Sequence, residues 1–165
     1  MAWRFNILVV ANVTADSPEL IEALLARTAD NPCSFALVVP APVTGSAGRE
    51  AAAARLNTAL ARMRAAGLDA DGAVGDHDVI AAVLDAWDPG RYDEIVVCTL
   101  PTGTSKWLQV DLPHRIQKLT DARVQHVIAE PPRPKPAPRR HHEEPARLGL
   151  LSPLGAVTGK RPPRA

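Results

Sequence analysis

The sequence predicts an α/β fold: an open sheet of five parallel strands with helices on both faces. Five short apolar runs alternate along the chain with segments of helical pattern, in the order βαβαβαβαβ. Each connection between successive runs is long enough to hold a helix, which favours right-handed crossovers and therefore parallel strands. The composition is 46% hydrophobic but only 4% aromatic, so aliphatic side chains must build the core.

The strands are expected at residues 5–11, 33–40, 68–74, 94–99 and 123–129. The first, second and fourth runs are largely apolar, as strands covered on both faces are. The third alternates Asp69 and Asp71 with small apolar residues, which is typical of an edge strand.

Four helices are expected between the strands. The first begins at Ser17-Pro18-Glu19, the second covers residues 49–66 and ends before Gly67, the third follows Gly75-Asp76, and the fourth is capped by Asp111. Helical spacing predicts an inward stripe on each helix. In chain order the stripes are Ile21, Leu24 and Leu25; Leu56, Ala59, Leu60 and Met63; Ile80, Val83, Leu84 and Trp87; and Leu112, Ile116 and Leu119.

The chain is expected to divide into a folded domain, residues 1–130, and a disordered tail, residues 131–165. The domain has a net charge of −5, whereas the tail has a net charge of +6 and holds nine of the 16 prolines. A tail of this composition buries too little apolar surface to order itself. An acidic domain argues against nucleic-acid binding.

The location expected from the sequence is the cytoplasm. We find no signal peptide and no apolar run long enough to span a membrane. Cys33 and Cys98 lie in predicted strands without metal-ligand or redox spacing, which indicates two buried, reduced thiols. His141-His142 lacks the further ligands of a metal site, so no metal is expected.

A ligand site is expected where the fourth strand opens into a loop. Residues 99–105 contain Pro101, Gly103 and four hydroxyl residues, and a helix begins shortly after them. Ligands of open α/β sheets bind at the carboxyl ends of such strands. The chain lacks GxGxxG, GxxxxGK[ST], GxSxG and HExxH motifs, so dinucleotide-fold, P-loop, hydrolase and zincin chemistry is not expected.

Three segments resemble the universal stress protein (UspA-like) family, specifically divergent actinobacterial members that lack the standard Gly-rich ATP motif. They are ILVVANVTADSPEL (7–20), GDHDVIAAVLDA (75–86) and DEIVVCTLPTGTSKWLQVDLPHRI (93–116). The resemblance implies a three-layer, Rossmann-like (HUP-type) fold with strand order 3-2-1-4-5. It also implies a regulatory or stress-response role without catalysis, a homodimer formed through the fifth strand, and ATP or another adenine nucleotide as ligand.

The implied nucleotide site lies between the first and fourth strands. Its candidate residues are Ala11, Asn12, Val13, Thr14, Val39, Thr99, Thr102, Gly103, Thr104, Ser105, Lys106 and Asp111. The chain departs from the family pattern at three places. Asn12 stands where ATP-binding members have an aspartate, Cys98 and Pro101 fall on the two glycines of GxxG, and Val110-Asp111 replaces Gly-Ser.

These departures predict an altered triphosphate site. Glycines let backbone N–H groups approach phosphates, whereas proline has no N–H to offer. Thr102 to Ser105 with Lys106 form a candidate substitute anion loop. A second interpretation stays open, in which Trp107 closes the pocket and the basic tail recruits an unknown protein partner. An enzyme that uses Cys98 or His114 is a third.

Overall fold

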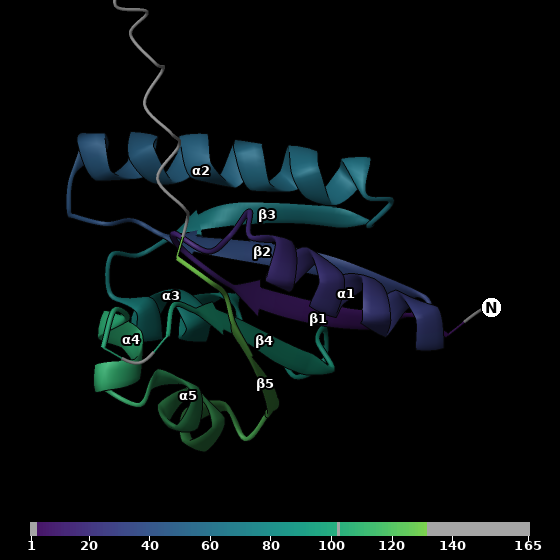
Figure 1. The fold of residues 1–165 in the computed structure, drawn as a ribbon. Helices are drawn as coiled ribbons and strands as arrows, with labels where there is room; N and C mark the ends of the chain where they lie inside the picture. The colour runs from purple at the N-terminus through teal and green to yellow at the C-terminus, as the bar shows by residue number, and fades with distance from the viewer. Residues whose placement is uncertain (1–2, 102, 132–165) are drawn as a thin grey trace, which may run out of the picture. The chain divides into compact units, whose positions relative to one another are not determined.

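The computed structural model describes residues 3–101 and 103–131, and it confirms the parallel sheet with helices on both faces (Figure 1). The strands are β1 (Phe5–Val10), β2 (Cys33–Pro40), β3 (Ala70–Gly75), β4 (Glu94–Thr99) and β5 (Arg123–Ile128). The helices are α1 (Pro18–Asp30), α2 (Ser46–Ala65), α3 (Val79–Ala86), α4 (Lys106–Gln109) and α5 (Leu112–Thr120). No helix among the described residues is long and apolar enough to cross a membrane. The predicted disordered tail lies, from residue 132 onwards, outside the described residues.

The strand order is β3-β2-β1-β4-β5, and every neighbouring pair is parallel. The order implied by the family resemblance is therefore confirmed. β1 lies at the centre, where Val9 pairs with Leu37 of β2 on one side and with Val96 of β4 on the other. β3 is an edge strand, as the alternating aspartates predicted, and β5 forms the opposite edge.

The core consists of two apolar layers, one on each face of the sheet. On one face α1 and α2 pack against side chains such as Val9 and Leu37. On the other, α3 and α5 pack against Leu8, Val10 and their neighbours. Successive strand residues point to opposite faces, and β1 and β4 are buried on both, so their apolar runs are continuous.

One buried carboxylate ties the first layer to the sheet. Glu94, at the start of β4, is only 4% exposed, and its carboxylate accepts a hydrogen bond from the Arg27 guanidinium of α1. Burying a charge is costly unless it is paired, so this ion pair fixes the end of α1 against the amino end of β4.

Several local signals act as the sequence predicts. Ser17 caps α1, because its hydroxyl accepts the Leu20 N–H over 3.3 Å. Gly67 follows α2 with φ at 86°, the left-handed conformation that favours glycine. The predicted inward stripe of α2 is buried throughout.

Three residues expected to face inward are instead exposed: Leu25, Leu84 and Leu119, at 38%, 45% and 54%. On α1 the sheet is contacted by Leu20 and Leu24, and Leu25 lies about 100° further round the helix. On α3 the smaller Ala82 faces the sheet, because the helix packs closely over Gly75, where a Cβ would come within 2.6 Å of the Ala82 Cβ.

The inward stripe of α5 is likewise shorter than predicted. Leu112 and Ile116, four residues apart, are buried against the sheet, and Leu119 falls beyond the stripe that they form. The predicted cap of this helix is also wrong. Asp111 adopts the left-handed conformation, with φ at 49°, and its side chain makes no cap hydrogen bond.

The contrast between two neighbouring leucines of α1 is testable. Leu24→Ala removes a fully buried side chain and leaves a cavity, so the free energy of unfolding should fall by about 2–5 kcal/mol. Leu25→Ala, at a partly exposed position, should cost less than about 1 kcal/mol. Urea unfolding followed by circular dichroism measures both, and equal losses would contradict the packing of α1 described above.

Candidate functional site

The carboxyl ends of β1 and β4 meet at the middle of the sheet. From β1 the chain continues into α1 on one face, and from β4 it continues through α4 into α5 on the other. The two loops therefore leave the sheet in opposite directions. Open α/β sheets bind ligands in the crevice that forms at such a point.

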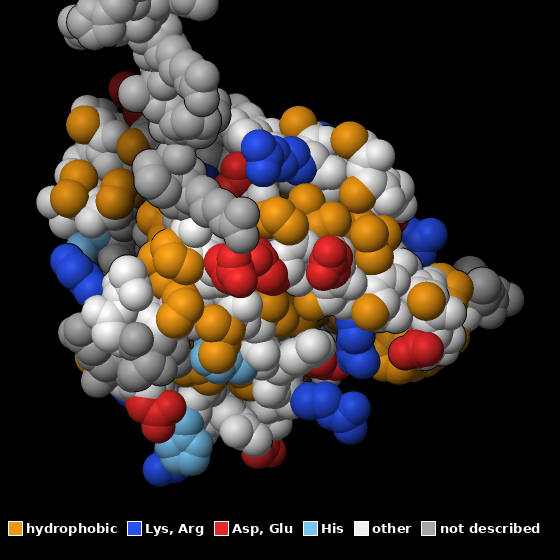
Figure 2. Space-filling view, in the orientation of Figure 1, with side chains coloured by type: hydrophobic (Ala, Val, Ile, Leu, Met, Phe, Trp, Pro, Cys, Tyr) orange, Lys and Arg blue, Asp and Glu red, His pale blue; other side chains and the backbone are white. Residues whose placement is uncertain are grey.

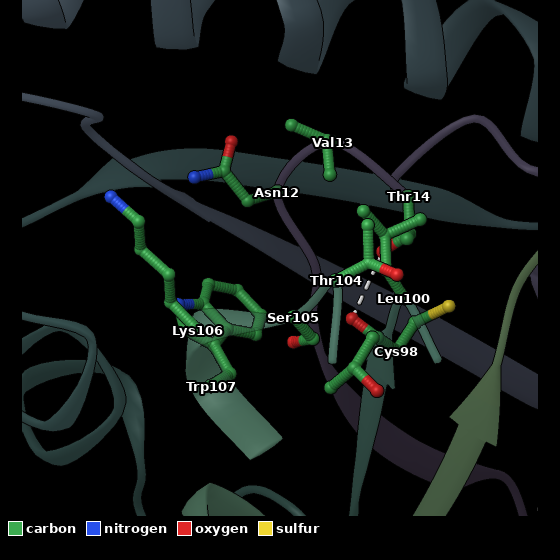
Figure 3. Close-up of a pocket in the computed structure, with 10 residues that line it drawn as sticks. Asn12, Val13, Thr14, Cys98, Leu100, Thr104, Ser105, Lys106 and Trp107 are labelled. Atoms are coloured by element: carbon green, nitrogen blue, oxygen red, sulfur yellow. Dashed lines mark hydrogen bonds between the residues drawn. The ribbon is translucent and has the colours of Figure 1, made fainter. Parts of the chain in front are cut away.

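A cavity of about 260 Å³ occupies this position (Figure 3). Its walls come from the loop after β1 and from the segment that joins β4 to α4. The lining residues are Asn12, Val13, Thr14, Cys98, Thr99, Leu100, Thr104, Ser105, Lys106 and Trp107.

The turn after β1 is held by its own backbone and by one bond to β4. The Ala15 N–H donates to the Asn12 carbonyl, and the Ser17 N–H to the Thr14 carbonyl, each over 3.1 Å. The buried Thr14 hydroxyl donates to the Cys98 carbonyl over 2.9 Å (dashed in Figure 3). This bond connects the loop after β1 to the end of β4, and the hydroxyl proton of Thr14 is therefore not free for a ligand.

The Asn12 side chain is oriented by a residue of α2. Its Oδ1 accepts a hydrogen bond from the Arg55 guanidinium. The backbone carbonyl of Asn12 therefore belongs to the turn after β1, whereas its side-chain oxygen is bonded to another element.

On the β4 side, the buried Thr99 is linked to the edge strand. Its Oγ1 lies 2.8 Å from Nε2 of His126 on β5, and its carbonyl accepts the Ala129 N–H over 2.8 Å. Burial lowers the pKa of His126, which favours a neutral ring. Thr99 lines the cavity, but its hydroxyl is already engaged with β5.

In the loop after β4, two backbone N–H groups form hydrogen bonds within the loop's own turn. The N–H groups of Thr104 and Ser105 both donate to the Pro101 carbonyl, over 3.1 and 3.2 Å, and Gly103 adopts φ of 95° within this turn. The substitute anion loop expected from the sequence therefore lacks these two backbone donors. The groups of this loop and α4 that line the cavity and can donate to an anion include the Thr104 and Ser105 hydroxyls, the Lys106 ammonium and the indole N–H of Trp107.

The short helix α4 closes one side of the cavity. The sequence predicts no helix at these residues, because four residues are too few to show a helical period. Trp107 is half-buried and packs against the core layer beneath α3 and α5 while lining the cavity, so it does not shut the cavity completely. Lys106 is exposed and takes part in none of the ion pairs formed among the described residues.

Both cysteines are buried and unpaired, as predicted. Burial raises the pKa of the Cys98 thiol, and its Sγ lies 3.9 Å from the Ser17 hydroxyl. Burial likewise raises the pKa of Cys33. A thiol with a raised pKa is a poor nucleophile at neutral pH. Within residues 3–101 and 103–131, no group of three or more His, Cys, Asp and Glu residues is placed to hold a metal ion.

The structure brings together most of the site residues predicted from sequence. Asn12, Val13, Thr14, Thr99, Thr104, Ser105 and Lys106 all line the cavity. Thr102 lies outside the described residues, and Gly103 shapes the turn without lining the cavity. Nucleotide binding by these residues stays a prediction.

Three other predicted site residues lie elsewhere. Ala11, directly after β1, and Val39 of β2 are fully buried in the layer beneath α1 and α2. Asp111 lies beyond α4, exposed and away from the cavity lining.

The cavity also includes three residues outside the predicted set. Cys98 and Leu100 flank the predicted Thr99, so their position at the strand end was a usable signal. Trp107 joins the lining because α4 turns its indole towards the strand ends (Figure 3).

Comparison with solved structures shows that universal stress proteins share this fold. The universal stress protein from Archaeoglobus fulgidus aligns with 74% of this chain and 93% of its own length, with a TM-score of 0.55 and 16% identity. A universal stress protein in complex with cAMP aligns with 78% of this chain and 98% of its own length, at the same TM-score and identity. No family model and no curated protein sequence matches the chain.

The link between Thr99 and His126 generates a pH prediction. Because burial lowers the folded-state pKa of His126, the unfolded chain takes up the proton first. The free energy of unfolding should therefore fall as the pH drops through the unfolded pKa of about 6.5 towards the folded value. His126→Gln keeps a hydrogen-bonding group but does not titrate, so it should lose less stability between about pH 7.5 and pH 5.5. Urea unfolding at both pH values measures the difference, and equal losses in parent and variant would contradict this assignment.

Proposed function

We propose that this chain is a universal-stress-protein-like regulatory domain that binds a small adenine-type nucleotide, such as AMP or cAMP, without acting on it. The observation that carries the proposal is the cavity at the ends of β1 and β4, which combines an aromatic wall, Trp107, with a cation, Lys106. Aromatic side chains stack on bases, and an ammonium group binds phosphate. The shared fold with universal stress proteins, one of them in complex with cAMP, supports the choice of ligand.

Size and donor supply favour a monophosphate over a triphosphate. The volume of about 260 Å³ lies below the range of roughly 300–1,000 Å³ that is common for ligand pockets. The backbone donors of Thr104 and Ser105 are used within the loop, and Pro101 has none. Lys106 is the one cation in the lining, which is little to balance the charge of three phosphates.

A binding role without catalysis is supported by the state of the candidate nucleophile. Cys98 is fully buried, and burial and the Glu19 carboxylate both raise the pKa of its thiol, which outweighs the hydrogen bonds from the Thr14 and Ser17 hydroxyls. His114 is exposed on α5 and does not line the cavity. The alternative role as a partner-recruiting module depends on residues of the tail that lie outside the described part of the chain.

Calorimetric titration of the full chain with AMP, cAMP and ATP tests the nucleotide proposal. We expect AMP or cAMP to bind more tightly than ATP. Lys106→Ala should weaken that binding about tenfold, because a charged hydrogen bond is lost. Lys118→Ala removes an exposed lysine of α5 outside the cavity lining and should have no effect. Absence of nucleotide binding, or binding unchanged by Lys106→Ala, would refute the proposed function.

The proposal includes a homodimer formed through β5. Within the described residues this strand pairs with β4 alone, so its outer edge offers unpaired backbone groups. Ile128 of β5 is 53% exposed, and Figure 2 shows hydrophobic side chains gathered over this strand. A second copy presents the same edge, and two such edges can pair about a two-fold axis.

The dimer is tested by measuring molar mass with light scattering after size-exclusion chromatography. Ile128→Lys places a charge on the proposed interface and should shift the chain to monomer. Leu119→Lys changes a leucine of similar exposure on α5 and should leave the mass of the parent unchanged. A parent chain that is monomeric, or a dimer that tolerates Ile128→Lys, would contradict an interface at β5.

A further inference from the structure

The orientation of one amide determines which ligand groups the cavity accepts beside β1. An asparagine can present either an acceptor oxygen or a donor NH₂ group, and the choice follows from its other hydrogen bonds. Arg55 has five N–H donors and no acceptor, so the atom of Asn12 that faces it must be the oxygen. The amide nitrogen is therefore turned to the other side.

That other side is the cavity. Figure 3 shows the Asn12 nitrogen on the side of Lys106 and the oxygen turned away from it. Asn12 Nδ2 forms no hydrogen bond with another described residue, and the ammonium of Lys106 is likewise a donor without an acceptor function. This end of the cavity thus presents donors from both walls.

The hydroxyls of Thr14 and Thr99 do not offset this excess of donors. The Thr14 proton is donated to the Cys98 carbonyl, and the Thr99 hydroxyl is bonded to His126. A ligand group that faces Asn12 must therefore accept hydrogen bonds. A group that brings its own N–H donors there would leave Nδ2 unpaired and would meet a second donor.

We propose that Arg55 is a specificity-determining residue: it locks the Asn12 amide so that the cavity selects a ligand by an acceptor oxygen and discriminates against an amino group at this position. The oxygen belongs either to a purine carbonyl or to a phosphate. Arg55 contacts Asn12 from α2 and is outside the cavity lining, so it acts on the ligand through the amide. This inference rests on the proposed nucleotide-binding function: a phosphate partner is compatible with an adenine base, whereas a carbonyl partner would replace adenine by an oxopurine such as hypoxanthine.

Calorimetric titration of the full chain with adenosine, inosine, AMP and IMP separates the two sources of oxygen. If the oxygen is the carbonyl, inosine and IMP should bind about tenfold more tightly than adenosine and AMP. If it is a phosphate oxygen, AMP and IMP should exceed the two nucleosides by a similar factor. Four equal affinities would overturn the selection rule but leave the proposed function standing, whereas no binding by any probe would overturn both.

Arg55→Met removes the hydrogen bond that orients the Asn12 amide, so the amide can rotate to face either a donor or an acceptor of the ligand. The ratio of affinities between the better-bound and the weaker-bound probes should therefore shrink about fivefold. Arg62→Met is the matched control. Arg62 lies two turns further along the same face of α2, and it donates to the Asp16 carbonyl over 2.9 Å, away from Asn12. This variant should keep the parent preference. A preference that survives Arg55→Met would refute the role of Arg55.

Two further measurements separate the role of Arg55 from a folding defect, and the first of them does not depend on ligand affinity. In the ligand-free protein, the side-chain NH₂ resonances of Asn12 should shift in Arg55→Met and stay in place in Arg62→Met. Asn12→Asp replaces the donor by a second acceptor beside Arg55, so the preference should be lost or reversed. Unshifted resonances in Arg55→Met, or an unchanged preference in Asn12→Asp, would count against the proposal.

Discussion

The pairing of β1 with β4 is the constraint on which the rest of this structure depends. β1 is buried on both faces and flanked by β2 and β4, so the strand order reverses direction beside it. Because the loops after β1 and β4 lead to opposite faces, the space at their ends is not filled by a crossover. The hydrogen bond from Thr14 to the Cys98 carbonyl holds these two ends together at the floor of the cavity.

Polar groups in this cavity divide into those that maintain the scaffold and those that remain for a ligand. Thr14, Thr99 and the backbone donors of the loop are engaged with β4, β5 and Pro101. The nitrogen atoms of the Asn12 and Lys106 side chains, and the hydroxyls of Thr104 and Ser105, stand at the cavity without such commitments. Polar groups that are already paired add little to affinity, so recognition depends on the second set.

The loop after β4 shows how a shared fold can carry a different chemistry. The two glycines of the nucleotide-binding pattern fall on Cys98 and Pro101, and the turn is instead closed by hydrogen bonds to the Pro101 carbonyl. Under the proposed function, side chains of α4 such as Lys106 take the place of a cradle of backbone N–H groups. Fold similarity at 16% identity is compatible with such a change, because the strand order is set by the core while the loop chemistry is set by a few residues.

The sequence by itself determined the five strands, the four longer helices and the place of the cavity, because apolar runs, helical periodicity and loop composition are local properties. β2 and β4 begin and end where the apolar runs do, and seven predicted residues line the cavity. Only the tertiary structure decided which leucines of α1, α3 and α5 face the sheet, since that depends on how closely each helix approaches, as Gly75 and Ala82 show. It also decided which atom of the Asn12 amide faces the cavity. Arg55 lies 43 residues away along the chain and reaches Asn12 only when α2 packs across the sheet.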